Sequence, residues 1–418
     1  MCFNSKQTGM VIIADDLTGA LDTAIKFSQR GAHTVAIDAR GAEQLVPYLE
    51  EGYEVVSVNT ATRHMEGEKA YRIVHSLVRC ALEHGVGCIY KKTDSVLRGN
   101  IAFEIEALKD ASRAAFIPFA PAYPELRRTV EDGIMKVAGI PLAQTSFAQD
   151  PFEPITSSDT RDLFLHSPLK AVSTCDGFFI PVDGQADVVV YDGRTGEDMY
   201  KLAQNLYKAG CRVFCGCAGF AEALSRLLFC GHVMPGRLVP RPMLVVCGSV
   251  NPVSKRQLEV LEKGGVPRVR LTEGEALEPD FTSSVKCGDL VDVIMGDLET
   301  EGLVILDTLA DISAVRGSAM ESACKVSRAL ASIVHSCIDR GEFTVFVIGG
   351  DTMLSLLEEL GRVAVEPVSE LEEGIVLSYV HHDGRRMTLL SKSGGFGSDD
   401  LIWSLVNDKE NEYQEVKL

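Results

Sequence analysis

The chain is organised around residues 88–100, which read Cys-Ile-Tyr-Lys-Lys-Thr-Asp-Ser-Val-Leu-Arg-Gly-Asn. A short apolar run turns abruptly into two lysines, a threonine, an aspartate and a serine. Asn100 can cap a following helix, whose buried face would hold Ile101, Ile105 and Leu108 at helical spacing. The stretch therefore predicts a strand, then a polar loop, then a helix.

The polar loop is a candidate ligand site. Ligands of open α/β sheets bind beyond the carboxyl ends of the strands. The loop would place a mixture of cations, hydroxyl groups and a carboxylate at such an edge, namely Lys92, Thr93, Asp94, Ser95 and Arg98. This mixture suits a small polyhydroxylated anion. A solvated turn is the alternative, because charged residues are mostly exposed.

Strand-like and helix-like segments alternate along the whole chain. Buried strands are expected near residues 10–14, 34–37, 54–58, 114–119, 187–191, 243–247, 302–306 and 343–348. Such alternation indicates an α/β protein with mostly parallel sheets flanked by helices. Polar clusters follow three of the early strands, at Asp15-Asp16, at 59–63 and at the Lys92 loop, so we expect them to share one sheet edge.

A chain of 418 residues is too long for one ordinary core and suits two domains. Prolines and a glycine between residues 233 and 242 predict a linker. We therefore expect domains at 1–232 and 243–410, with a frayed polar tail at 411–418.

Composition narrows the function. The chain is 46% hydrophobic and 24% charged, values of a soluble globular protein. Its net charge of −18 argues against nucleic acid or an anionic membrane surface as a partner. No apolar run is long enough to span a membrane, and the first short run meets two aspartates, so the cytoplasm is the expected compartment. A homodimer is compatible with the sequence.

The cysteines predict no metal centre. The chain has 12, and their tight cluster is Cys211, Cys215 and Cys217. No second pair follows at zinc-finger spacing, so Cys215 and Cys217 are expected on one buried strand.

The second half carries three glycine-rich or serine-containing loops after strands. Gly349-Gly350-Asp351-Thr352 follows an uninterrupted apolar strand and opens a helix, the geometry that holds phosphate on backbone N–H groups. Ser249 follows another strand in the same way, and the third loop, 391–397, contains Lys392, Gly394 and Gly395. Three such loops in one domain predict nucleotide binding.

Two common nucleotide motifs are missing from the sequence. It holds no Gly-x-x-x-x-Gly-Lys-Ser/Thr, so a P-loop is excluded. The first strand leads to Asp15-Asp16-Leu17-Thr18-Gly19 rather than Gly-x-Gly-x-x-Gly, which disfavours NAD. A kinase that holds phosphates with backbone loops remains. Asp15 or Asp16 could then deprotonate a substrate hydroxyl, help to hold Mg²⁺, or cap the following helix.

These motifs resemble the four-carbon acid sugar kinases. The resemblance rests on Ile13–Ala20 and Lys92–Asn100, with further landmarks in order at 121–154, 248–249, 349–352 and 392–397. It implies a sugar-acid domain followed by an ATP domain, with the active site in the cleft between them. It also implies ATP-dependent phosphorylation of threonate, erythronate or an oxo-tetronate at the terminal hydroxyl, with Mg²⁺. Residues 124–128 and 133–134 depart from the family pattern, which leaves the identity of the acid open.

The resemblance assigns most of the site residues by motif, and Asp15, Thr93 and Lys392 are added from their places in the same loops. Asp15, Asp16, Arg63, Lys92, Thr93, Asp94, Ser95 and Arg98 are expected around the sugar acid. Asp16 and Asp94 are the expected catalytic groups, and the metal ligands are not assigned. Ser249, Gly349, Gly350, Asp351, Thr352, Lys392, Gly394 and Gly395 are expected around ATP. A kinase of another small hydroxy acid and a non-catalytic sensor of both ligands remain as alternatives.

Overall fold

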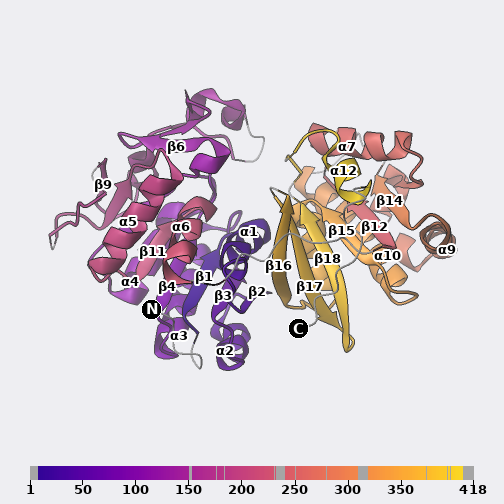
Figure 1. Ribbon diagram of the computed structural model, residues 1–418, viewed down its shortest axis with the longest axis horizontal. Coiled ribbons are helices and arrows are strands. Elements are labelled where there is room, and N and C mark those ends of the chain that lie inside the picture. The colour runs from indigo at the N-terminus through magenta and orange to yellow at the C-terminus, as the bar shows by residue number, and fades with distance from the viewer. Residues whose placement is uncertain are drawn as a thin grey trace. The chain divides into compact units, whose positions relative to one another are not determined.

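The computed structural model describes residues 8–149, 153–175, 177–182, 184–229, 231, 241–249, 251–278, 280–308, 319–372, 374–392, 394–395 and 397–407. The predicted tail at 411–418 and all but the last two residues of the predicted linker at 233–242 lie outside these residues. The chain divides into two compact units, Met1–Met234 and Pro235–Leu418, referred to below as unit 1 and unit 2. Figure 1 shows that each is a sheet flanked by helices, as expected from the sequence.

Unit 1 is built on a parallel sheet in the order β2-β3-β1-β4-β11-β5-β10-β9. Its strands are β1 (Met10–Ala14), β2 (Thr34–Asp38), β3 (Val55–Asn59), β4 (Cys88–Lys92), β5 (Ile117–Ala120), β9 (Ala171–Thr174), β10 (Val188–Tyr191) and β11 (Val213–Gly216). Every residue of β1, β3 and β4 is buried, because helices cover both faces of these central strands.

The helices of unit 1 form two layers. They are α1 (Leu17–Ser28), α2 (Ala42–Glu50), α3 (Gly67–Glu83), α4 (Ile101–Ser112), α5 (Gly196–Lys208) and α6 (Ala218–Leu228). α6 packs against α1 and α5, and α3 packs against α2 and α4. The connections through α1 and α5 run along the sheet in one direction and those through α2, α3 and α4 in the other. Right-handed crossovers then place the two groups on opposite faces.

The irregular segment after β5 forms a small antiparallel sheet. It contains β6 (Arg128–Glu131), β7 (Ile134–Val137) and β8 (Ile140–Pro141), joined in the order β6-β7-β8. Short 3₁₀ turns follow, including Ser146–Gln149 and Thr160–Phe164. This segment supplies side chains to the candidate site described below.

Unit 2 has the sheet order β13-β14-β12-β15-β18-β17-β16, parallel from β13 to β18 and antiparallel beyond. Its strands are β12 (Met243–Cys247), β13 (Arg268–Leu271), β14 (Leu303–Thr308), β15 (Thr344–Ile348), β16 (Val365–Glu372), β17 (Ile375–His382) and β18 (Arg385–Lys392). Its helices are α7 (Pro252–Lys263), α8 (Glu273–Leu277), α9 (Val285–Glu301), α10 (Ala319–Ile338), α11 (Gly350–Glu359) and α12 (Leu401–Asn407).

Helices of unit 2 cover its core. α7 and α12 contribute Leu258, Leu261 and Ile402 to a cluster that includes Val245 and Phe346 of the central strands. α10 packs against α9 and α11. Among the described residues, no helix is both long enough and apolar enough to cross a membrane.

The structure differs from the sequence prediction at three elements of unit 2. α11 begins at Gly350, so most of the segment predicted as a phosphate loop before the helix forms the first turn of the helix itself. β13 and α9 were not predicted. The sequence did not indicate a strand at β13 because Arg268 and Arg270 interrupt its apolar pattern. In the structure both arginines pair with Glu262.

Candidate active site

The polar ends of three strands of unit 1 lie at one edge of its sheet. β1 pairs in parallel with β3 and β4, and Ala14 lies opposite both Asn59 and Lys92. β11 continues the sheet beside β4, with Gly216 opposite Lys92. The segments that follow these strands therefore start side by side, and the shared edge expected from the sequence is confirmed.

Arg63 lies among three carboxylates at this edge. Its Nε donates to Asp15 Oδ2 at 2.7 Å, its Nη1 is 2.8 Å from Asp16 Oδ2, and its Nη2 is 3.7 Å from Asp94 Oδ1. Burial disfavours the charge, but the carboxylates outweigh it and hold the pKa of Arg63 well above its usual value. Arg63 thus joins three loops, and any substrate anion would share a guanidinium that already has partners.

Asp94 organises the loop after β4. It accepts hydrogen bonds from the backbone N–H groups of Val96 at 3.1 Å and Arg98 at 3.3 Å. The Arg98 guanidinium also binds it in a fork, through Nε at 3.1 Å and Nη2 at 3.0 Å. Burial would raise the pKa of Asp94, but Arg63, Arg98 and Lys92 outweigh it and lower the pKa. A carboxylate with so many donors is a poor proton acceptor, so the geometry gives Asp94 a structural role.

Asp16 caps α1. Its Oδ1 accepts from the backbone N–H of Gly19 at 2.9 Å, while its Oδ2 pairs with Arg63. The capping role that the sequence left open is therefore present. Its side chain is 29% exposed, against 2% for Asp15 and 9% for Asp94, so Asp16 is the carboxylate of the three that a ligand can reach most easily.

Three polar groups at the same edge lack partners among the described residues. Lys92 is 4% exposed, yet its ammonium makes no hydrogen bond or ion pair there. Asp15 Oδ1 and Thr93 Oγ1 are buried without hydrogen-bond partners. A Cβ on Gly19 would lie 2.7 Å from Lys92 Nζ, so this glycine leaves room for the ammonium. Buried polar groups are normally paired, and a bound ligand is the simplest partner for these.

Lys91, the neighbour of Lys92, has a structural role. Strand alternation sends its side chain to the other face of the sheet, where Nζ is 3.0 Å from Glu104 Oε2. Thr62 donates to the other oxygen of Glu104. This buried network attaches α4 to the strand edge.

The prediction that the Asn100 side chain caps α4 is wrong. Asn100 occupies the N-cap position but makes no capping hydrogen bond. Its amide nitrogen instead donates to the carbonyl oxygens of Thr62 and Met65, each at 2.8 Å. Asn100 therefore holds the loop that carries Arg63.

Sequence analysis missed two charged residues of the irregular segment. Arg128 donates to Ser95 Oγ and stacks over Phe147, with 5.9 Å from its guanidinium carbon to the ring centroid. Glu153 Oε1 is 3.3 Å from His64 Nδ1. Neither residue follows a strand of the main sheet, so no local pattern indicated them.

The three predicted nucleotide loops of unit 2 meet at one edge of its sheet. They follow β12, β15 and β18, which are neighbours in that order. A Cβ on Gly394 would lie 2.2 Å from Ser249 Oγ, and a Cβ on Gly349 would lie 3.5 Å from Ser249 N. Ser254 of α7 donates to the Gly394 carbonyl at 2.7 Å. The loops are packed so closely that a side chain at Gly394 would force Ser249 to shift.

Gly349 and the start of α11 have the geometry of an anion site. Gly349 has φ of +117°, a conformation that side chains rarely adopt, and its N–H donates to the Lys392 carbonyl at 2.9 Å. Gly350, Asp351 and Thr352 then form the first turn of a helix of 10 residues. Thr352 is buried and Asp351 is exposed.

Lys392 supplies a buried cation beneath these loops. The residue is 2% exposed at the end of β18. Burial lowers its pKa to about 8, and Cys247 partly opposes the shift. The ammonium would regain its ordinary pKa beside an anion such as phosphate.

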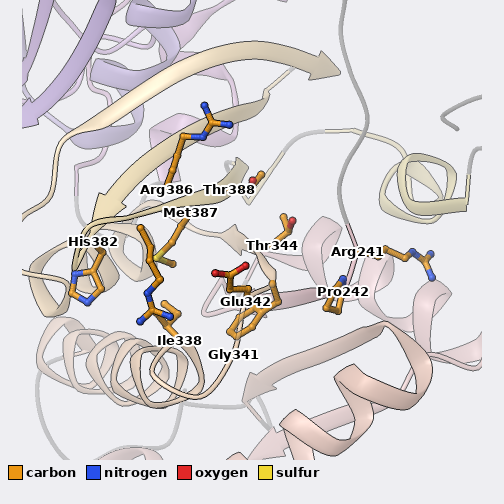
Figure 2. Close-up of a pocket in the computed structure, with 12 residues that line it drawn as sticks. Arg241, Pro242, Ile338, Gly341, Glu342, Thr344, His382, Arg386, Met387 and Thr388 are labelled. Carbon is orange, nitrogen blue, oxygen red and sulfur yellow. The ribbon is translucent and has the colours of Figure 1, made fainter. Parts of the chain in front are cut away.

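A separate cavity of about 310 Å³ lies at the opposite edge of the unit 2 sheet, near the start of β15 and β18 (Figure 2). Its lining includes Arg241, Thr344 and Arg386. Arg241 already donates to the Val406 carbonyl at 2.7 Å, and Arg386 lies 4.3 Å from the centroid of the Tyr379 ring. The cavity does not coincide with the nucleotide loops, and we assign it no role.

The part of the chain that the structure describes holds no group of three or more His, Cys, Asp or Glu side chains able to bind a metal ion. In particular, Cys215 and Cys217 are buried near the end of β11. Cys217 donates to the Ala122 carbonyl at 3.1 Å, and both thiols have pKa values raised by burial.

Comparison with known proteins agrees with this division. Residues 10–224 match the family described as a sugar-binding N-terminal domain, and residues 244–402 match the nucleotide-binding C-terminal domain. A D-threonate kinase of Bordetella bronchiseptica is 29% identical over 403 residues, covering 94% of this chain and 95% of its own. A D-erythronate kinase of Heliobacterium modesticaldum is 26% identical over 438 residues, covering 96% and 97%.

A solved structure of a Salmonella typhimurium LT2 protein has the same fold, with a TM-score of 0.79 and 19% identity, covering 96% of this chain and 99% of that one. The family match spans more than half of the chain, and the motifs at Ile13–Ala20 and Lys92–Asn100 fall within it. The chain therefore belongs to the four-carbon acid sugar kinase family, with its sugar-binding domain in unit 1 and its nucleotide-binding domain in unit 2.

Proposed function

We propose that the chain catalyses ATP-dependent phosphorylation of a four-carbon sugar acid, such as threonate, erythronate or an oxo-tetronate, at its terminal hydroxyl. The observation that carries this proposal is the set of partnerless groups in unit 1. A buried ammonium at Lys92, a carboxylate oxygen at Asp15 and a hydroxyl at Thr93 match an anion that also carries hydroxyl groups. The sugar-acid kinases among the relatives support the same class of substrate.

Within unit 1, Lys92 is assigned to the substrate carboxylate. Asp15, Thr93 and Ser95 are assigned to its hydroxyl groups, and Arg63, Asp94 and Arg98 hold the loops that surround it. Asp16 is assigned as the general base, because it is the most accessible of the three aspartates around Arg63. Asp94 was the other catalytic prediction, and its saturated hydrogen bonds make it the second choice.

Within unit 2, the loops around Ser249, Gly349 and Gly394 are assigned to the ATP phosphates, together with the first turn of α11. Lys392 adds a positive charge that phosphate would stabilise. Mg²⁺ is assigned to arrive with ATP, because Mg²⁺ usually keeps several waters and binds through substrate phosphates and one or two carboxylates. We propose the cytoplasm as the compartment of the reaction, because ATP is available there.

An ATP-consumption assay over a panel of four-carbon acids tests the proposal. The panel should contain both enantiomers of threonate and erythronate, the oxo-tetronates, and three-carbon and five-carbon hydroxy acids as controls. Turnover confined to four-carbon acids is the expected result. Turnover of a control acid alone would indicate a different hydroxy-acid kinase, and binding of acid and ATP without turnover would indicate a sensor. Light scattering during gel filtration would determine whether the chain forms a homodimer.

A further inference from the structure

Three arginines at the carboxyl edge of the unit 1 sheet differ in their ion pairs. The guanidinium of Arg63 pairs with three aspartates, and that of Arg98 binds Asp94 in a fork. Arg128 is partly buried, yet it forms no ion pair with any residue that the structure describes. Its charge is therefore the one of the three that no described carboxylate offsets.

The backbone of Arg128 is fixed beside the strand end that carries Lys92. Arg128 and Tyr123 exchange backbone hydrogen bonds of 2.7 Å and 3.0 Å. The carbonyl that precedes Tyr123 accepts a hydrogen bond from Cys217 Sγ at 3.1 Å. Cys217 directly follows β11, whose last residue lies opposite Lys92. An unbroken series of contacts thus joins Arg128 to the end of β4.

The side chain of Arg128 reaches the loop that follows β4. Its Nη1 donates to the hydroxyl oxygen of Ser95, three residues beyond Lys92, and the guanidinium lies over the ring of Phe147. The remaining N–H groups of the guanidinium have no hydrogen-bond partner in the described part of the chain. Ser95 accepts from Arg128, so its own O–H is left to donate to a substrate hydroxyl.

We propose that Arg128 is a substrate-binding residue that shares the carboxylate of the sugar acid with Lys92. The inference rests on the proposed function and adds to it a residue from the small antiparallel sheet. A carboxylate has two oxygens that accept several hydrogen bonds, so it can bind a guanidinium and an ammonium together. Lys92 and Arg128 suit this role because neither forms an ion pair with a described residue.

Titration calorimetry with each four-carbon acid of the panel, in the presence of a non-hydrolysable ATP analogue, tests the inference. Arg128→Gln removes the charge, and Arg128→Lys keeps the charge but loses the forked geometry. Arg127→Gln is the matched control, because it removes the same charge from the exposed neighbouring residue. Circular dichroism and a melting curve establish that each variant is folded.

We expect Arg128→Gln to raise the dissociation constant of the acid by about ten- to a hundredfold, the value of a charge-assisted hydrogen bond. Arg128→Lys should raise it by about three- to tenfold. Arg127→Gln should stay within about twofold of wild type, as exposed charges contribute little. A folded Arg128→Gln protein with the wild-type constant overturns the inference, as does an equal loss in Arg127→Gln.

A double variant separates direct binding from an effect exerted through Ser95. If Arg128 only positioned Ser95, the protein with both Ser95→Ala and Arg128→Gln would bind the acid as Ser95→Ala does. Direct binding predicts that the double variant binds at least about tenfold more weakly than Ser95→Ala. Equal affinities of these two proteins therefore overturn the inference.

Failure of the inference can be separated from failure of the proposed function. The proposed function fails if wild type turns over none of the four-carbon acids in the ATP assay. The inference about Arg128 fails if wild type binds no acid, or binds one no more tightly than Arg128→Gln does, whatever the turnover. Should Arg128→Gln not fold, Arg128→Lys is judged in its place, and a wild-type dissociation constant then overturns the inference.

Discussion

Lys392 offers a quantitative test of the nucleotide site. Its ordinary pKa is 10.5, and burial lowers it to about 8 in the folded chain. Holding the ammonium in the folded protein at neutral pH therefore costs about 3 kcal/mol. A phosphate beside the loop at Gly394 would stabilise the charge and return the pKa toward its ordinary value. Binding of ATP above pH 8 should then take up a proton.

The number of protons taken up on binding follows from the two pKa values of Lys392. At pH 9 about nine-tenths of the free protein has Lys392 neutral, so binding should take up close to one proton per ATP analogue. The affinity should fall by up to about tenfold per pH unit between pH 8 and 10.5. Titration calorimetry of a non-hydrolysable ATP analogue, in two buffers of different ionisation enthalpy, measures the uptake.

Lys392→Met is the control for this experiment. It should bind the analogue more weakly at pH 7 and should show no proton uptake at pH 9 beyond that of the nucleotide itself. Equal uptake by wild type and Lys392→Met would refute the assignment of Lys392 to the phosphates.

The lowered pKa of Lys392 also predicts how the stability of the folded protein changes with pH. The folded pKa lies below the unfolded one, so the unfolded chain binds more protons between pH 8 and 10.5. The contribution of Lys392 to stability must therefore rise with pH across this window. Urea unfolding of the free protein at pH 7.5, 8.5 and 9.5 measures this. The stability of wild type relative to Lys392→Met should improve over the series, and a constant difference would contradict the burial argument.

Three further predictions concern the loops. Lys92→Met should raise the dissociation constant of the sugar acid by roughly ten- to a hundredfold, since a charge-assisted hydrogen bond is worth about 1.5–3 kcal/mol. A rise in the dissociation constant of ATP instead would place Lys92 in the nucleotide site. In calorimetry, Gly394→Ala should weaken ATP binding more than Gly395→Ala does. The new methyl group would lie 2.2 Å from Ser249 Oγ at position 394, but 3.3 Å from its nearest neighbour at position 395. Equal effects would contradict the assignment of this loop to the ATP phosphates. If Asp16 is the base, Asp16→Asn should lower turnover by about 10²–10⁴-fold with near-normal substrate binding. If Asp16 only caps α1, the substitution should lower stability by only about 1 kcal/mol and leave the rate unchanged.

The sequence by itself determined the architecture. Buried parallel strands read as uninterrupted apolar runs, and the residue after each run has to lie at the carboxyl edge of the sheet. For that reason the segments after β1, β3 and β4 could be placed together, and so could the loops at Ser249 and Gly349. These predictions needed only local patterns and the rule that consecutive crossovers are right-handed.

The tertiary structure decided which of these polar residues form hydrogen bonds and ion pairs within the protein. Asn100 had the spacing of a helix cap, but in three dimensions the carbonyl groups of Thr62 and Met65 lie within its reach. Asp94 was predicted as a catalytic group, and only the folded loop shows that its oxygens accept hydrogen bonds from the Arg98 guanidinium and from two backbone N–H groups.

Contacts between distant segments were likewise invisible in the sequence. Arg128 reaches Ser95 across 33 residues, and Thr62 meets Glu104 across 42. No periodicity encodes such pairs, because they depend on how the small antiparallel sheet and α4 pack against the main sheet. Local chemistry therefore predicted which polar segments meet at one sheet edge, and packing decided which of their groups lack partners among the described residues.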